Sequence, residues 1–141
     1  MNKHFYEVAP TEVREALPVL DNTVSRTLIF LGIYPCRKGH LLLKDGILYY
    51  LIQYAKGATT DLYRCVAMWH NCTPRAAESN IRSAIRAAYD TGALYKINDL
   101  LGITIVDKCY SLSNMEFISL VAQYCYYSDV SIIVRTKLPL A

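Results

Sequence analysis

Apolar and polar residues alternate with a helical period along most of this chain. The pattern predicts helices over residues 19–32, 38–56, 61–71, 73–91, 94–101 and 113–127. The second segment is apolar on most sides, which is typical of a helix at the centre of a core. Ser113 and Glu116 form the pattern of a capping box at the start of the last segment. The sequence therefore predicts an all-α domain of about six helices.

The segments outside this pattern divide the chain. Residues 1–18 are polar and contain Pro10 and Pro18, so we expect an N-terminal arm with at most one short helix, over residues 11–17. Residues 19–128 form the predicted domain. Residues 129–141 are expected to form a C-terminal tail, either a strand that pairs with another copy or a frayed end. Inside the domain, the β-branched residues 103–106 predict a brief extended segment.

The helix predicted over residues 73–91 has both of its ends marked. Thr73 suits the N-cap, Pro74 the first helical position, and Gly92 the left-handed conformation that follows a helix. At about 100° per residue, the apolar side chains on one side are Ala77, Ile81, Ala84, Ile85 and Ala88. The opposite side carries Arg75, Ser79, Arg82 and Arg86, flanked by Glu78 and Ser83. The helix therefore has a small inner face and a narrow basic outer face.

The segment before this helix suggests what the basic face does. A short helix over residues 61–71, begun at Asp61, leads through a tight connection at residues 71–73 into the longer basic helix. This is the layout of a helix-turn-helix, in which the second helix enters the DNA major groove. Arginine suits both guanine edges and phosphates. A solvated surface helix gives the same arginine stripe, so the stripe alone leaves both interpretations open.

Composition narrows the class of protein. The chain has 141 residues, of which 53% are hydrophobic and 19% charged, so it is predicted to be globular. The formal net charge of +3 permits a nucleic acid partner without arguing for one. Five cysteines without regular spacing indicate reduced thiols. We find no signal peptide and no apolar run of about 20 residues, and we expect a cytoplasmic protein that makes no membrane contact.

Few residues suggest chemistry other than binding. Cys65, His70 and Cys72 lie close together, but structural zinc sites usually have a second pair of ligands, which the sequence lacks. No cysteine–histidine nucleophile with an orienting group is apparent. His40 is expected at the surface or against a phosphate. We therefore predict no metal, no cofactor and no catalytic residue, and the chain is not expected to be an enzyme.

Ordered pieces of the sequence carry a family resemblance. They are Leu31-Gly32-Ile33, Lys38-Gly39, Leu43, Ile47, Glu78, Ile81-Arg82, Ala84-Ile85, Ala88, Gly92, Glu116-Phe117-Ile118 and Val121-Ala122. From about residue 25 to residue 124 the chain resembles the C-terminal DNA-binding domain of the stage-zero sporulation response regulator of endospore-forming bacteria. The resemblance implies a helix-turn-helix whose second helix lies in the major groove. It also implies copies that sit side by side on tandem sites.

The resemblance assigns some residues and leaves others open. In the family, Glu78 and Arg82 match positions that face DNA, whereas the pattern places no arginine at Arg75 or Arg86. The family carries basic residues around Ala76 and Ser79 that this chain lacks, so its base preference is not implied here. The family protein also has a phosphorylated receiver domain before this region. We expect a stand-alone relative without one.

Two functional hypotheses follow. In the first, the chain is a sequence-specific transcription regulator that binds double-stranded DNA, with itself and RNA polymerase as further possible partners. Arg82 would contact guanine, and Glu78 would orient Arg82 or accept from a cytosine amine. The other expected DNA contacts are Arg75, Ser79, Ser83 and Arg86 on the same helix, and Lys38 and Arg64 on the backbone. In the second, the chain is a protein-interaction module, or an antagonist of a related regulator, that works through its last helix and tail.

Overall fold

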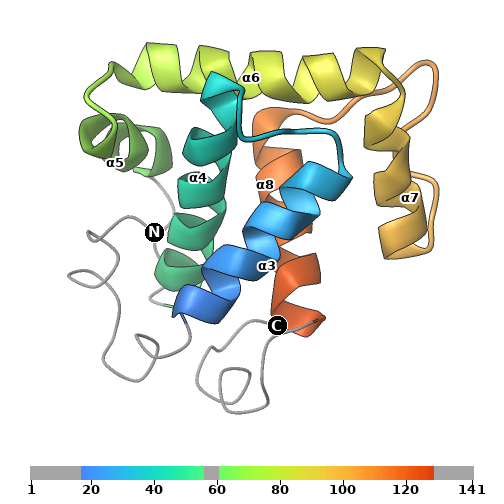
Figure 1. Cartoon of the computed structure of the whole chain (residues 1–141), viewed down its shortest axis with the longest axis horizontal. Helices are drawn as coiled ribbons and strands as arrows, with labels where there is room; N and C mark the ends of the chain where they lie inside the picture. Colours follow the sequence, from blue (N-terminus) through green and yellow to red (C-terminus); the bar gives the residue numbers. More distant parts are fainter. Residues whose placement is uncertain (1–16, 56–60, 129–141) are drawn as a thin grey trace.

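The computed structural model describes residues 17–55 and 61–128 of the chain. In this part of the chain the regular structure is helical, as predicted, and no strand is present (Figure 1). The elements are α3 (Leu17–Phe30), α4 (Lys38–Ala55), α5 (Leu62–Trp69), α6 (Pro74–Asp90), the 3-10 turn η1 (Ala93–Tyr95), α7 (Lys96–Leu101) and α8 (Asn114–Tyr127). None of the described helices is long and apolar enough to span a membrane.

Helix α4 is the centre of the core. It packs against α3, α5, α6 and α8, and α6 runs across the ends of α4 and α8 (Figure 1). Its buried apolar side chains are Leu42, Leu43, Ile47, Leu48, Tyr49, Leu51 and Ile52. Leu41, which belongs to the same apolar run, is 48% exposed and lies outside the core. The prediction of a central core helix is confirmed except at that residue.

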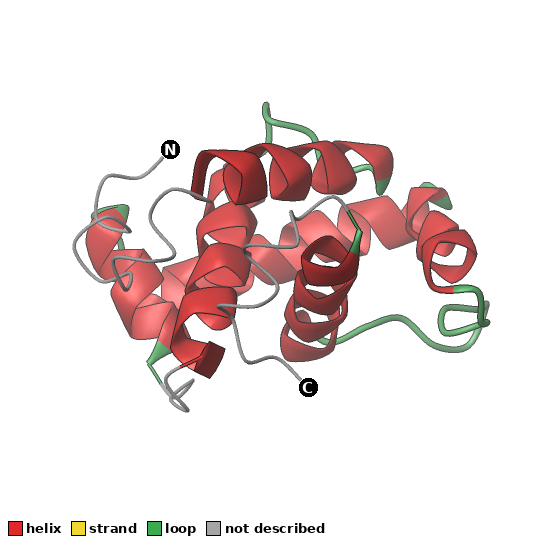
Figure 2. Cartoon of the chain, turned by 90° about the horizontal axis from the view of Figure 1, so that it is seen from below, coloured by secondary structure: helices red, strands yellow, loops and turns green. Residues whose placement is uncertain are grey.

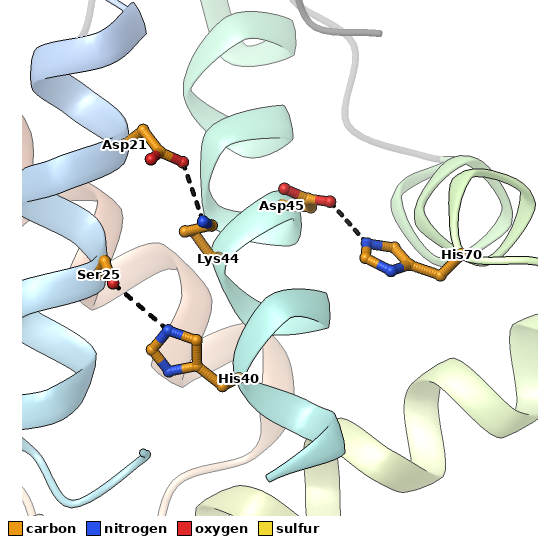
Figure 3. Close-up of polar contacts among 6 residues, drawn as sticks. All are labelled: Asp21, Ser25, His40, Lys44, Asp45 and His70. Carbon is orange, nitrogen blue, oxygen red and sulfur yellow. Dashed lines mark hydrogen bonds and ion pairs between the residues drawn. The ribbon is translucent and has the colours of Figure 1, made fainter. Parts of the chain in front are cut away.

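Polar side chains also anchor α4 to its neighbours (Figure 3). His40 is buried, with Nδ1 2.9 Å from the carbonyl oxygen of Ile33 and Nε2 3.4 Å from Oγ of Ser25. The expectation of a surface or phosphate-contacting His40 is therefore wrong, because both ring nitrogens are used inside the fold. Lys44 and Asp21 form an ion pair at 3.2 Å between α4 and α3.

The first helix begins earlier than the sequence predicts. It starts at Leu17, which is fully buried, and Pro18 occupies its first turn, where the missing N–H is tolerated. Two residues assigned to the N-terminal arm therefore belong to α3. Residues 1–16 of the arm, which include all but the last residue of the helix expected over residues 11–17, lie outside the described residues, as does the C-terminal tail.

The connection between α7 and α8 differs from its prediction. Residues 103–106 form no strand in the described part of the chain, and Figure 2 shows the connection as a loop. The amide side chain of Asn98 replaces a strand partner. It accepts from the N–H groups of Ile105 and Val106 at 2.8 and 2.9 Å and donates to the carbonyl of Val106 at 2.9 Å. After this loop, Ser113 and Glu116 form the predicted capping box of α8.

Candidate nucleic-acid interface

The helices α5 and α6 form the predicted helix-turn-helix. His70 follows α5, Asn71 adopts a left-handed conformation at φ 55°, and Thr73 caps α6 by accepting from the N–H of Ala76 at 3.0 Å. Gly92, at φ 83°, follows the other end of α6 in the left-handed conformation. The marked ends of this helix are thus confirmed.

Asp61 takes the N-cap position of α5 but does not cap it through its side chain. Its carboxylate instead forms an ion pair at 2.8 Å with Arg64, one turn further along the chain. Arg64 is one of the expected backbone contacts, and its side chain is 73% exposed despite this pair. It therefore remains accessible to a phosphate.

The two faces of α6 differ as the sequence predicts. Its buried residues are Ala77, Ile81, Ala84, Ile85 and Ala88, which are the predicted inner face. The exposed residues of the opposite side include Arg75, Ser79, Arg82, Ser83 and Arg86, while Glu78 is half-buried. The structure thus brings six of the predicted site residues onto one helix face.

Carboxylates pair with two of the three arginines on this face. Arg82 donates to Glu78, one turn before it, and Arg86 lies 3.3 Å from the carboxylate of Asp90, one turn after it. Arg75 makes no ion pair with any described residue. The first turns of the helix also line a surface hollow, formed by Thr73, Arg75, Ala76, Glu78, Ser79 and Arg82. Arg75 and Arg82 therefore line this hollow in the N-terminal half of α6, whereas Arg86 lies beyond it.

Lys38 lies beside this helix. It is exposed at the first position of α4, and its neighbour Gly39 packs against Asn80 and Ala84 of α6. Lys38 is consequently near the flank of α6, as a backbone-contacting residue requires.

Two residues behind the basic face were not predicted from the sequence. Asn114, the first residue of α8, donates to the backbone carbonyl of Glu78 at 3.1 Å. Tyr63 of α5 lies near Asn114, and the charges of Glu78 and Arg82 act on the pKa of its phenol in opposite directions. No local pattern marks either residue, because their partners are on other helices.

The turn of the helix-turn-helix is attached to the core by a side-chain hydrogen bond. Nε2 of His70 lies 2.6 Å from Oδ2 of Asp45 on α4 (Figure 3). Cys65 and Cys72, which lie near His70 in sequence, are free thiols. Over residues 17–55 and 61–128, no group of three or more histidine, cysteine, aspartate or glutamate side chains is arranged to hold a metal ion.

Comparison with known families agrees with this geometry. The family described as "Sporulation initiation factor Spo0A C terminal" matches residues 24–125. This range includes α5, the turn and α6, and it covers more than half of the 141-residue chain. The family is a DNA-binding regulatory domain and not a catalytic one. The chain therefore belongs to the Spo0A C-terminal family of DNA-binding domains.

Proposed function

We propose that this protein is a sequence-specific transcription regulator that inserts the N-terminal half of α6 into the major groove of double-stranded DNA. One observation carries the proposal. Arg82 is exposed but held by Glu78, next to a hollow formed by the first turns of a capped recognition helix. In helix-turn-helix proteins these turns contact the base edges. An arginine held in one direction is suited to pairing with guanine through two hydrogen bonds.

The other residues of the face divide by position. Ser79 lies within the hollow and is suited to a short polar contact with a base. Arg75, near the cap and without an ion pair to a described residue, is available to a phosphate or a base. Arg86 and Ser83 lie nearer the C-terminal end of α6, where a helix leaves the groove. We assign Arg86 to the phosphate backbone, with Lys38 and Arg64.

Selection of DNA fragments by the purified protein, at two salt concentrations, tests this function. We expect a short enriched motif that persists at the higher salt. Arg82→Ala should lose the preference at one position and about 1–3 kcal/mol of binding free energy for the selected site. Arg26→Ala is the matched control, because it removes an exposed arginine of α3 that lines a hollow without residues of α6.

Other outcomes would reject parts of the proposal. Binding without a motif, lost as salt rises, would leave only nonspecific affinity and favour the protein-interaction hypothesis. Uniform weakening of all fragments by Arg82→Ala would show that Arg82 contacts phosphate. The length of the motif, and the number of copies bound to it, would show whether copies bind side by side.

A further inference from the structure

The side chain of Asn114 is hydrogen-bonded to a backbone carbonyl of α6. Its Nδ2 donates to the carbonyl oxygen of Glu78 at 3.1 Å, and the residue is only 9% exposed. In an α-helix this same carbonyl also accepts the backbone N–H of the residue four positions later, which is Arg82. A carbonyl oxygen has two lone pairs and can accept both. The carbonyl oxygen of Glu78 therefore accepts both the side-chain hydrogen bond from α8 and the backbone hydrogen bond from Arg82.

Tyr63 of α5 lies near the same part of α6. Burial raises the pKa of its phenol, while the neighbouring Asn114 side chain lowers it and the charges of Glu78 and Arg82 act on it in opposite directions. Tyr63 therefore lies within electrostatic reach of both members of the ion pair. Residues from three helices, α5, α6 and α8, converge behind the face that we assign to DNA.

The Asn114 side chain is not needed to start its own helix. Ser113 and Glu116 already satisfy the first turn of α8 through the capping box. A buried amide lowers stability unless it is hydrogen-bonded, and here its partner lies on another helix, 36 positions away in sequence. The amide therefore serves as a tertiary link between α8 and α6.

We propose that Asn114, assisted by Tyr63, positions the Glu78–Arg82 pair for base reading and so determines specificity without touching DNA. The inference rests on the function proposed above. Without the link, α6 would keep its helix and its arginines, but the pair would lose the support that fixes its direction. Asn114 is then a positioning residue, and its removal should affect the base preference that belongs to Arg82.

A double-mutant cycle on the selected DNA site tests this role. Asn114→Ala should weaken binding to that site about tenfold. It should also reduce the preference at the same base position that loses its preference in Arg82→Ala. The double variant should bind about as weakly as Arg82→Ala alone, because both changes disable one unit. Affinity for unrelated DNA should be unchanged. Additive effects of the two changes would overturn the proposal.

Asn98→Ala is the matched control. Asn98 also uses a side-chain amide to bond backbone groups, but its partners lie in the connection between α7 and α8. Its effect should add to that of Arg82→Ala and leave the motif unchanged. Urea unfolding of both asparagine variants separates a loss of folded protein from a loss of specificity.

Tyrosine variants provide a second test that does not depend on the folding of Asn114→Ala. Tyr63→Phe removes only the hydroxyl. It should reduce the preference at the base position that Arg82 reads by about twofold to fivefold. Tyr89→Phe is its control, since that hydroxyl donates to the carbonyl of Asp107 at 2.7 Å, outside the cluster. An unchanged motif with Tyr63→Phe would exclude Tyr63 from the role. A wild-type protein without any base preference would instead reject the function proposed above.

Discussion

At the scale of single residues, the position of the helix-turn-helix depends on a buried carboxylate. The side chain of Asp45 on α4 is 4% exposed, and His70 contacts it at 2.6 Å directly before the turn. A hydrogen bond to a charged group stabilises a fold by about 1.5–3 kcal/mol. We therefore expect His70→Ala to lower the free energy of unfolding by about 1.5–3 kcal/mol, as measured by urea denaturation.

Arg64→Ala provides the comparison for that measurement. Its ion pair with Asp61 lies at the surface, where such pairs contribute at most about 1 kcal/mol. If His70→Ala destabilised the protein no more than Arg64→Ala, the His70–Asp45 contact would not hold the turn to the core.

Glu116 predicts a particular dependence of stability on pH. The Tyr110 hydroxyl donates to its carboxylate at 2.6 Å, the Ser113 N–H donates at 2.9 Å, and both lower the pKa of Glu116. A carboxyl whose pKa is lowered by folding stabilises the protein above its unfolded pKa, and this contribution disappears as pH falls through the folded pKa. Stability should therefore decline on acidification below the ordinary value of 4.5.

Glu116→Gln isolates this contribution. Glutamine also serves at this position of a capping box, but it does not titrate. We expect the variant to lose less stability than the wild type between neutral pH and about pH 3, in urea unfolding series. Equal losses in the two proteins would assign the acid sensitivity to other carboxyl groups.

At the scale of elements, the approach of α4 to α6 requires a glycine. A Cβ on Gly39 would lie 2.6 Å from both the Cβ of Ala84 and the backbone oxygen of Asn80. Gly39→Ala should therefore push α6 away from α4. We expect a loss of about 1–3 kcal/mol in the free energy of unfolding, together with weaker binding to the selected site.

Gly46 provides the control for this prediction. It lies in the same helix, but a Cβ added there would not meet α6. Its added Cβ would meet Leu62 at 3.4 Å and Ile118 at 3.8 Å, which are ordinary contacts. Alanine is favoured over glycine inside a helix by about 0.5–1 kcal/mol. Gly46→Ala should consequently be neutral or stabilising. Similar destabilisation by both changes would point to a general effect in α4 and not to its approach to α6.

The sequence predicted the elements better than the contacts between them. Helix α6 was predicted with its cap and inner face because Thr73, Pro74 and the apolar spacing are local signals. The roles of Asn98 and Asn114 were not predicted, since each amide finds its partners only after the chain has folded. His40 was misplaced for the same reason, since a polar residue two positions after Lys38 is expected to be exposed until α3 supplies Ser25.

The candidate site shows the same division. Spacing placed six of the expected DNA contacts on one face of α6, because helical geometry follows from position alone. Spacing is also compatible with the two roles expected for Glu78, which are to orient Arg82 or to accept from a cytosine amine, and the ion pair between Glu78 and Arg82 fits the first of them. It gave no indication of Tyr63 behind them, because that residue belongs to another helix.

At the scale of the whole molecule, the chain carries only a small excess of positive charge. The formal net charge is +3, and Glu78 and Asp90 pair with two of the arginines on α6. Nonspecific affinity depends on the number of phosphates that are neutralised. We therefore expect nonspecific binding to depend on a few exposed cations, among which Lys38 and Arg64 come from helices other than α6.

Lys38 allows this expectation to be tested. Lys38→Gln should weaken binding to all sequences alike and reduce the slope of log affinity against log salt by about 1, because one phosphate contact is lost. The control is Lys96→Gln on α7, whose ammonium group lies 5.1 Å from the ring centre of Phe30. That change should leave both the affinity and the slope unaltered. If Lys38→Gln instead changed the selected motif, Lys38 would read a base, and the reading surface would extend from α6 onto the start of α4.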